Sequence, residues 1–359
     1  TSAEERKELL ALLLVQSEVC FDTETNSIDA LHADLVGFSF SYKAREAFYV
    51  AVPSDFTAAK AIVQEFALVF EDISIEKIAH NIKYDLKVLH RYGITMKGPL
   101  FDTMIAQYLI NPESKQGMDF LATYYLNYQP ISIEALIGKK GKNQLSMRQV
   151  EVEAVKEYAV EDADITLQLK QHFQPILERV GTKKLFDEIE IPLVEVLAAM
   201  EREGIRLDVD FLKAMSTDMA KEITAFEQKI YEEAGETFNL ASPKQLGDIL
   251  FDKLKIGGSK PKKTKTGQYA TGEEVLSYLA KDNEIVQHIL EWRQMVKLQN
   301  TYVEALPNQV DAKTNRVHTD YMQTVAATGR LSSNNPNLQN IPIRTERGRQ
   351  IRKAFIARD

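Results

Sequence analysis

Cysteine is almost absent from this sequence, because Cys20 is the only one among 359 residues. A lone cysteine cannot form an internal disulfide, so we expect a small buried side chain in a cytoplasmic protein, where thiols stay reduced. The six histidines form no H-x-x-x-H or Cys/His pattern with the spacing of zinc ligands. A zinc site is therefore not expected.

Long hydrophobic runs are absent as well. No segment approaches the ~18 apolar residues that cross a bilayer. The opening TSAEERKELLALLLVQ has acids before its short apolar run and no small-residue cleavage site, unlike a signal peptide. We expect a monomer without membrane contact, and the length predicts two or three domains.

Positive charge is scarce over the whole chain, whose net charge is −8. Binding of nucleic acid depends on local patches, however, and these are basic in the second half. Residues 253–265 contain six lysines and no acid, and residues 316–359 carry a net charge of +5. The acids of the first half need another explanation.

The order of sequence patterns predicts an α/β domain followed by a mostly helical region. Three β-rich runs, EVCFDTET, LVGFSFSY and EAFYVAVP, suggest antiparallel strands, and helical patterns follow up to about residue 178. Strands covered by helices form a layered α/β domain. Later residues are mainly helical, apart from a Gly/Lys/Thr-rich stretch at 257–272 that we expect to be a mobile basic loop.

A pair of acids stands out in the first predicted strand. Asp22 and Glu24 are two residues apart in CFDTET and point to one face, while Thr23 and Thr25 point to the other. Adjacent carboxylates repel each other unless a cation lies between them, and oxygen ligands favour Mg²⁺ or Mn²⁺. On its own, such a pair is more often simply solvated.

Two later segments add candidate groups. In HNIKYD a predicted strand gives way to a helix, so Asn81 can hold the turn and Asp85 lies in the first helical turns. In YAVEDADIT, Tyr158 and Asp162 are four apart and share one helix face. That face is apolar, and an aspartate there must be paired or bind a metal ion.

Other polar and aromatic residues have structural explanations. Asp102 in FDTM is expected to cap a helix, and Trp292 is expected to lie in a core. Glu161 and Asp164 fall on the flanks of the Asp162 face and are expected to be solvated. His80 could contact a phosphate or pack in its turn.

The motifs DTET, NIKYD and YxxxD resemble, in this order, those of the DEDD exonucleases in their tyrosine variant. KGKNQLS, FNLASPKQLGDILF and TGRLSSNNPNLQNIPIRTERGRQIRKAF extend the resemblance over essentially the whole chain, to the large-fragment portion of bacterial family A DNA polymerases. The resemblance implies a ribonuclease-H-like exonuclease domain at residues 1–178, with a mixed sheet and flanking helices. It further implies a helical thumb at 179–315 and the start of an α+β palm at 316–359.

The resemblance also implies roles for the motif residues. Asp22, Glu24 and Asp162 would hold one Mg²⁺ or Mn²⁺ ion, and Asp22 would bind a second with help from Asp85 through water. Tyr158 and Glu24 would orient the water that attacks the 3′ terminal phosphodiester of DNA.

Further positions match DNA contacts of the family. Ile28 and Asn81 would touch the terminal nucleotides of a single-stranded 3′ end. Basic and amide side chains of the second half would contact the primer–template duplex, and these are Lys260, Lys262, Lys263, Arg330, Asn337, Gln339 and Asn340.

The expected function is proofreading removal of nucleotides during DNA replication and repair. A DNA-binding scaffold with an inactive site and an RNA-trimming exonuclease are the alternatives. The complete set of acids with Tyr158 weighs against the first alternative, and the polymerase-like second half against the second. The family's polymerase carboxylates lie in motifs beyond AFIARD, beginning with DYSQxELR, so we expect these residues alone not to synthesise DNA.

Overall fold

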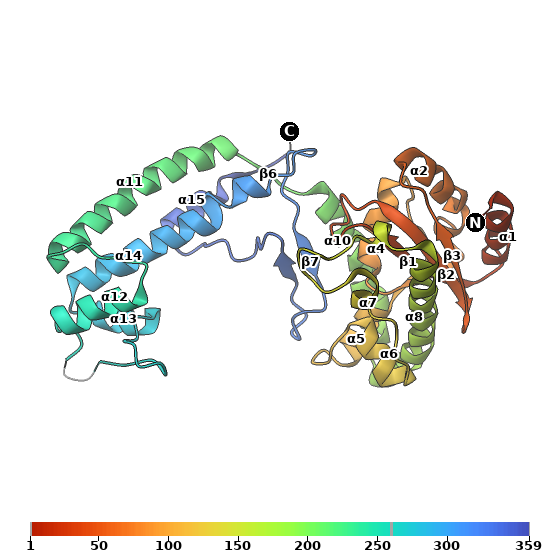
Figure 1. Cartoon of the computed structure of the whole chain (residues 1–359), viewed down its shortest axis with the longest axis horizontal. Coiled ribbons are helices and arrows are strands. Elements are labelled where there is room, and N and C mark those ends of the chain that lie inside the picture. Colours follow the sequence, from red (N-terminus) through yellow and green to blue (C-terminus); the bar gives the residue numbers. More distant parts are fainter. Residues whose placement is uncertain (1, 259–260, 359) are drawn as a thin grey trace. The chain divides into compact units, whose positions relative to one another are not determined.

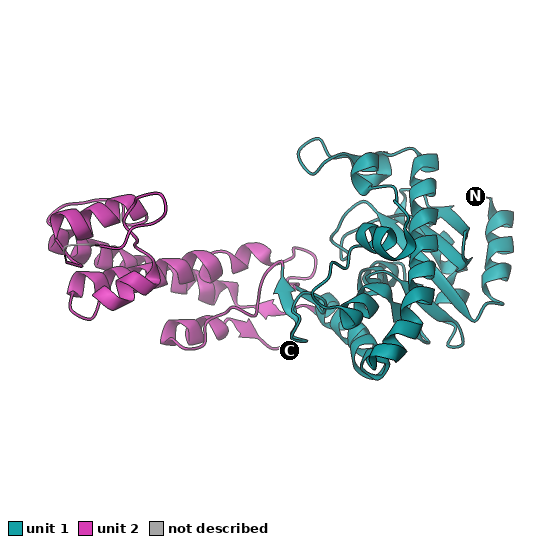
Figure 2. Cartoon of the chain, turned by 90° about the horizontal axis from the view of Figure 1, so that it is seen from below, with its two compact units in different colours: residues 1–203, 320–334 teal, residues 204–319, 335–359 magenta. Residues whose placement is uncertain are grey.

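A computed structural model of the chain describes residues 2–258 and 261–358. It contains two compact units (Figure 2). The first unit comprises the residues up to Glu203 together with Asp320–Asn334, and the second comprises Gly204–Thr319 and the residues from Asn335 onward. A piece of the second half of the sequence thus belongs to the first unit. The expected domain boundaries near residues 178 and 315 remain predictions.

The first unit is built on a five-stranded mixed sheet with flanking helices, as expected for the first domain. Strand β1 is central; β2 and β3 pair antiparallel on one side of it, and β4 and β5 pair parallel on the other. In spatial order the strands are β3 (Glu46–Ala51), β2 (Leu35–Lys43), β1 (Glu18–Thr25), β4 (Glu76–Ala79) and β5 (Leu100–Asp102).

The two faces of the sheet differ in the size of their side chains. One face is aromatic: Phe21, Phe38 and Phe40 pack against Phe66 and Phe70 from the region of helices α2 (Phe56–Glu65) and α3 (Ala67–Phe70). The other face carries small residues that let a helix approach closely, namely Cys20, Gly37, Ser39 and Ser41. Cys20 is buried, as expected for a lone cysteine.

Helix α8 (Val152–Val180) packs on the face with small residues, against β1, β2 and β3 (Figure 1). It ends at Gly181, whose φ of +78° suits glycine. The remaining α-helices and strands among the described residues of the first unit are α1 (Ala3–Leu13), α4 (Ile82–Arg91), α5 (Thr103–Ile110), α6 (Met118–Leu126), α7 (Ile133–Ile137), α9 (Lys183–Leu185), α10 (Ile191–Glu203), β7 (Asp320–Met322) and β8 (Ser332–Asn334). A 3₁₀-helix, Met147–Gln149, and a π-helix, Phe186–Glu190, also belong to it.

The second unit is mainly helical. Its elements are β6 (Arg206–Leu207), α11 (Val209–Ala234), α12 (Pro243–Gly247), α13 (Glu273–Leu279), α14 (Glu284–Leu298), α15 (Glu346–Arg352) and β9 (Phe355–Ile356), with β6 and β9 paired. Helices α11 and α14 pack together. Trp292 of α14 lies in this core, as expected, and its indole N–H donates to Glu227 at 3.0 Å.

The stretch expected to be a mobile loop is folded over its described part. Residues 262–270 form a hairpin, in which Thr264 N–H donates to Gln268 C=O at 2.7 Å and Ala270 N–H to Lys262 C=O at 2.9 Å. Tyr269 anchors the hairpin, since its hydroxyl donates to Asp252 at 2.6 Å and its ring packs on Phe251. The Gly/Lys/Thr-rich composition did not indicate this hairpin, because its anchor is a single aromatic residue, Tyr269.

Across the described residues, no helix has the length and apolar character needed to cross a membrane.

Candidate active site

Three carboxylates meet where β1 and α8 pack together. Asp22 and Glu24 project from the same face of β1, and Asp162 projects toward them from the middle of α8. Oxygen atoms of all three lie within 4.8 Å of one another. Strand alternation places Asp22 and Glu24 on one face of β1, and the packing of α8 against β1 brings Asp162, another motif residue, to them.

The cluster is electrostatically strained without a cation. Burial raises the pKa of Asp22 to about 6. Burial and, next, the charge of Asp22 raise the pKa values of Glu24 and Asp162 well above their ordinary range. The buried oxygen Oε1 of Glu24 has no hydrogen-bond partner in the part of the chain that the structure describes. An unpartnered carboxylate oxygen between two other acids fits a divalent metal ion, whose charge and coordination would satisfy it.

Asp85 reaches the site from helix α4. It is buried, and its carboxylate accepts a hydrogen bond of 2.5 Å from the Thr23 hydroxyl. Burial first, and then the charge of Asp22, raise the pKa of Asp85 well above normal. Thr23 faces away from Asp22 and Glu24, as its place in the strand predicts, but its bond to Asp85 was not foreseen. Asp85 stands outside the group of three acids that lie within 4.8 Å of one another.

The turn before α4 is held by one acid. Asn81 adopts a left-handed conformation with φ +65° at the start of α4, in agreement with its expected role in the turn. Asp102 accepts from the N–H groups of Asn81 and Ile82 as well as from those of Met104 and Ile105, at 2.8–3.3 Å. It therefore caps α5, as expected, and also fixes the start of α4.

Tyr158 lies one helical turn before Asp162. Its pKa is raised by burial and by the neighbouring charge of Asp162, so the phenol stays protonated at neutral pH. A hydrogen bond from this phenol partly offsets the rise in the pKa of Asp162. The ring packs beside Val36 and Met147, which limits its motion. A fixed, protonated hydroxyl at this place can orient a water molecule.

The acids on the flanks of Asp162 are partly exposed and also accept hydrogen bonds that the sequence did not predict. Glu161 accepts from the Tyr128 hydroxyl at 2.6 Å and from Ile131 N–H at 2.7 Å. Asp164 accepts from Arg45 N–H at 2.5 Å. These donors come from loops distant in sequence, which helical spacing alone does not reveal.

Gly37 and Tyr49 are further residues that the motifs do not indicate. Gly37 lies directly opposite Glu24 in the β1–β2 pair. A Cβ atom on Gly37 would lie 2.2 Å from the Tyr49 hydroxyl, so the glycine makes room for this phenol beside the Glu24 strand. The nearby charge of Glu24 adds to the burial that raises the pKa of Tyr49. The signal in the sequence is one glycine within a strand pattern.

The positions expected to touch a 3′ end differ in exposure. The side chain of Ile28 is 96% exposed just beyond β1, which is unusual for an apolar residue. Asn81 is also exposed. His80 packs into its turn, with Nδ1 2.9 Å from the Thr103 hydroxyl, so of its two expected explanations the structural one holds.

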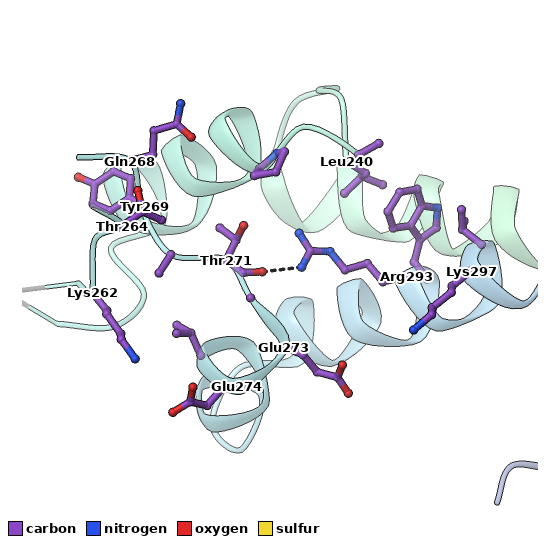
Figure 3. Close-up of a pocket in the computed structure, with 17 residues that line it drawn as sticks. Leu240, Lys262, Thr264, Gln268, Tyr269, Thr271, Glu273, Glu274, Arg293 and Lys297 are labelled. Carbon is purple, nitrogen blue, oxygen red and sulfur yellow. Dashed lines mark hydrogen bonds between the residues drawn. The ribbon is translucent and has the colours of Figure 1, made fainter. Parts of the chain in front are cut away.

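In the second unit, Lys262 lines a pocket of about 790 Å³ together with two cations that the motifs did not indicate, Arg293 and Lys297 (Figure 3). Arg293 donates to Thr271 C=O at 2.5 Å and has no ion-pair partner among the described residues. Lys263 is exposed and lies over the Tyr269 ring at 4.8 Å. The structure supports no statement about Lys260, which lies outside the described residues.

The residues expected near a primer–template end fall in different units. Arg330 is exposed and belongs to the first unit, whereas Asn337, Gln339 and Asn340 belong to the second. The Asn337 side chain accepts from Gln339 N–H at 3.0 Å and Asn340 N–H at 3.2 Å. Asn337 thus shapes a turn, and the amide side chains of Gln339 and Asn340 are exposed there.

A second group of possible metal ligands lies between α11 and α14. It consists of Glu233, Glu284 and His288. The Nδ1 atom of His288 is 3.0 Å from Glu233, and its Nε2 atom is 2.7 Å from the Lys229 ammonium. A lysine therefore already supplies the positive charge that a metal ion would bring, and this group needs none.

The fold and its acidic cluster define an α/β domain with a site that could hold divalent metal ions, joined to a mainly helical unit. The family model described as 3′–5′ exonuclease matches residues 1–178, and that of DNA polymerase family A matches residues 209–359. The chain therefore belongs to the family A DNA polymerases and combines a 3′–5′ exonuclease domain with polymerase-domain sequence.

Individual relatives agree with this assignment. The chain is 43% identical to DNA polymerase I of Pseudomonas aeruginosa over 94% of its length and 38% of that protein. It is 42% identical to DNA polymerase I of Chloroflexus aurantiacus over 94% of its length and 36% of that protein. The chain thus spans little more than a third of these relatives.

A solved structure, the POL domain of Pol1 from M. smegmatis in complex with DNA primer-template and dNTP, matches with a TM-score of 0.83 and 31% identity. The match covers 99% of this chain and 58% of the other.

Proposed function

We propose that this protein removes deoxynucleotides one at a time from the 3′ end of DNA by metal-dependent hydrolysis, and so proofreads during replication and repair. The observation that carries the proposal is the group of Asp22, Glu24 and Asp162, of which Glu24 and Asp162 are buried and in which Glu24 Oε1 has no hydrogen-bond partner among the described residues. Four raised carboxyl pKa values around one point favour a cationic cofactor over a structural ion pair.

Each residue has a chemical task in this proposal. Asp22, Glu24 and Asp162 would hold one Mg²⁺ or Mn²⁺ ion, and Asp22 would bind a second, which Asp85 would reach through water. The two ions, when bound, supply activation of water and stabilisation of the charge that develops on the phosphate and the leaving 3′ oxygen. The protonated Tyr158 hydroxyl and Glu24 orient the attacking water. No covalent intermediate with the protein is needed.

The proposed ligand of the first unit is a single-stranded 3′ end. Ile28 is apolar and almost fully exposed close to Asp22 and Glu24 in the sequence, which suits contact with a terminal base or sugar. The exposed amide of Asn81 can bond a nucleotide edge or phosphate. We propose a ribonuclease-H-like classification for this unit, which its mixed sheet and flanking helices support.

The proposed ligand of the second unit is duplex DNA at a primer–template end, and we propose residues 179–315 as the thumb and 316–359 as the start of the palm. Lys262, Arg293 and Lys297 line one pocket, and the guanidinium of Arg293, which has no acidic partner among the described residues, suits a phosphate (Figure 3). The relative from M. smegmatis is bound to DNA primer-template, which supports the same partner here. Phosphate contacts of this kind do not depend on DNA sequence.

The test is release of nucleotide from a 3′-labelled single-stranded oligodeoxynucleotide, with Mg²⁺ and with EDTA. Asp162→Asn should lower the rate about a thousandfold or more, since it removes a metal ligand from the site. Asp164→Asn, two residues along the same helix, is the matched control and should retain the parent's rate. Equal rates for parent and Asp162→Asn would refute the assigned site.

The same assay separates the two alternatives. An inactive scaffold would release no nucleotide under any metal condition while still binding DNA. An RNA-trimming enzyme would degrade a 3′-labelled RNA of the same sequence faster than the DNA. We expect metal-dependent release from DNA at the higher rate.

A further inference from the structure

Helix α4 carries a candidate metal ligand on one side and two buried lysines on the other. Lys83 and Lys87 are one turn apart, and each is only 8% exposed. Asp85 lies between them in sequence, and a helix turns by about 100° per residue, so Asp85 points away from both. The orientation of α4 therefore sets the position of Asp85.

A single carboxylate binds both lysines. Glu201 of α10, which is 1% exposed, contacts Lys83 through Oε1 and Lys87 through Oε2, the latter at 2.5 Å. It also accepts from Tyr321 N–H at 2.7 Å. Helix α10 packs against both α4 and β7 (Figure 1).

Strand β7 completes this ionic group. The Asp320 carboxylate lies 2.9 Å from the Lys83 ammonium and 3.7 Å from that of Lys87, and Lys83 also donates to the Tyr321 carbonyl. Two lysines and two acids thus balance in charge. Asp320 is half exposed, so among the described residues Glu201 is the only fully buried counterion of the two ammonium groups.

The sequence separation explains why no motif reveals this group. Glu201 lies outside both family-model ranges, and Asp320 is about 120 residues further on, in the range of the polymerase model. Both nevertheless belong to the same compact unit as α4. Residues of the polymerase-like part of the chain therefore support the helix that carries an exonuclease ligand.

We propose that Glu201 is a positioning residue for the exonuclease reaction, which holds α4, and with it Asp85, in the orientation that the metal site requires. Without its charge, two buried ammonium groups would repel each other and lack a buried partner. The helix would then shift so that the lysines reach water, and Asp85 would leave its place beside Thr23. This inference rests on the proposed metal-dependent function.

The test compares Glu201→Gln with the parent in the full chain. We expect the Mn²⁺ concentration for half-maximal nucleotide release to rise about tenfold, as for loss of other groups that hold metal ligands indirectly. Direct Mn²⁺ binding, followed by the electron paramagnetic resonance of free Mn²⁺ without DNA, should weaken by a similar factor. If the parent binds Mn²⁺ but releases no nucleotide, the proposed function is refuted. The Mn²⁺ affinities of the parent and Glu201→Gln still test the inference in that case.

A matched control removes the acid from another cation of the same unit, on helices that carry no proposed site residue. Arg6 of α1, whose side chain is 13% exposed, donates to Glu65 of α2 at 2.7 and 2.9 Å. Glu65→Gln should lower thermal stability but leave Mn²⁺ affinity unchanged. Equal Mn²⁺ affinity in Glu201→Gln and the parent would overturn the inference, because Glu201 would then serve stability alone.

A milder variant covers the case in which Glu201→Gln does not fold. Asp320→Asn removes the half-exposed acid and leaves Glu201 in place, so the fold is expected to persist. We expect it to weaken Mn²⁺ binding about threefold, less than the tenfold typical of indirect ligand contacts. Parent-like Mn²⁺ affinity in this variant, with Glu201→Gln unable to fold, would equally overturn the inference.

Discussion

Ionisation of the Asp22 carboxyl group lowers the stability of the folded, metal-free protein. Its pKa is raised by burial to about 6, against an ordinary value of 3.8. An asparagine has nearly the same shape and no charge. We therefore expect Asp22→Asn to stabilise the metal-free first unit at pH 8, while it removes the exonuclease activity.

The size and the sign of this stability change follow from proton linkage. The folded state holds the Asp22 proton to higher pH than the unfolded state, so stability is lost as pH rises from about 3.8 to about 6 and stays lost above that. Each pH unit in this interval corresponds to about 1.4 kcal/mol, which gives roughly 3 kcal/mol at pH 8 and about half as much at pH 5. Removing the Asp22 charge also eases the ionisation of Glu24, Asp85 and Asp162, and this adds to the gain.

Hydrogen exchange of the β1 amides in EDTA measures this stability difference within the first unit. At pH 8 the variant should exchange about a hundredfold more slowly than the parent, and the ratio should shrink toward pH 5. Trp292 lies in the second unit, so unfolding followed by its fluorescence serves as an internal control and should not respond. With saturating Mn²⁺ the β1 amides of the parent should exchange more slowly than those of the variant, because only the parent is stabilised by bound metal.

Two results would refute this reasoning. One is faster β1 exchange in Asp22→Asn than in the parent at pH 8 without metal. The other is a variant-to-parent ratio that does not change with pH. Asp102→Asn provides a contrast, since Asp102 is buried but accepts four backbone hydrogen bonds. That variant should be destabilised, by about 1–3 kcal/mol, through the donors it leaves unpaired.

Three more predictions concern the site and the DNA contacts. Tyr158→Phe should slow nucleotide release about ten- to a hundredfold with unchanged Mn²⁺ binding, and an unchanged rate would leave Tyr158 a packing residue. Gly37→Ala should lower both the melting temperature of the first unit and the rate of release, because the new Cβ atom would lie 2.2 Å from the Tyr49 hydroxyl; a parent-like melting curve would contradict this. Replacing Lys262 and Lys263 by Gln should reduce the salt dependence of duplex binding, with a slope flatter by up to ~0.9 per lost contact, and equal slopes would mean that neither lysine contacts phosphate.

Local periodicity was enough to predict which acids share a face of their own strand or helix, whereas their meeting in one metal site was implied by the family resemblance. Asp22 and Glu24 share a face because strands alternate, and Tyr158 and Asp162 share one because four residues make about one helical turn. Sequence patterns also predicted a layered α/β domain with antiparallel strands and the capping role of Asp102, and the resemblance added the mixed sheet with flanking helices. The shared faces and the cap depend on a few neighbouring residues, whose geometry hardly changes with the rest of the fold.

Pairings between distant side chains were beyond such reasoning. The bonds of Glu161 to Tyr128 and Ile131 were not predicted, nor was the hairpin in the basic stretch, which Tyr269 anchors through Asp252. Glu201 contacts Lys83 and Lys87 of α4, which lie more than 100 residues earlier in the chain. The sequence pattern predicts which face of its own helix or strand a side chain lies on. Its hydrogen-bond or ion-pair partner depends on where other elements pack. Only the tertiary structure decides that.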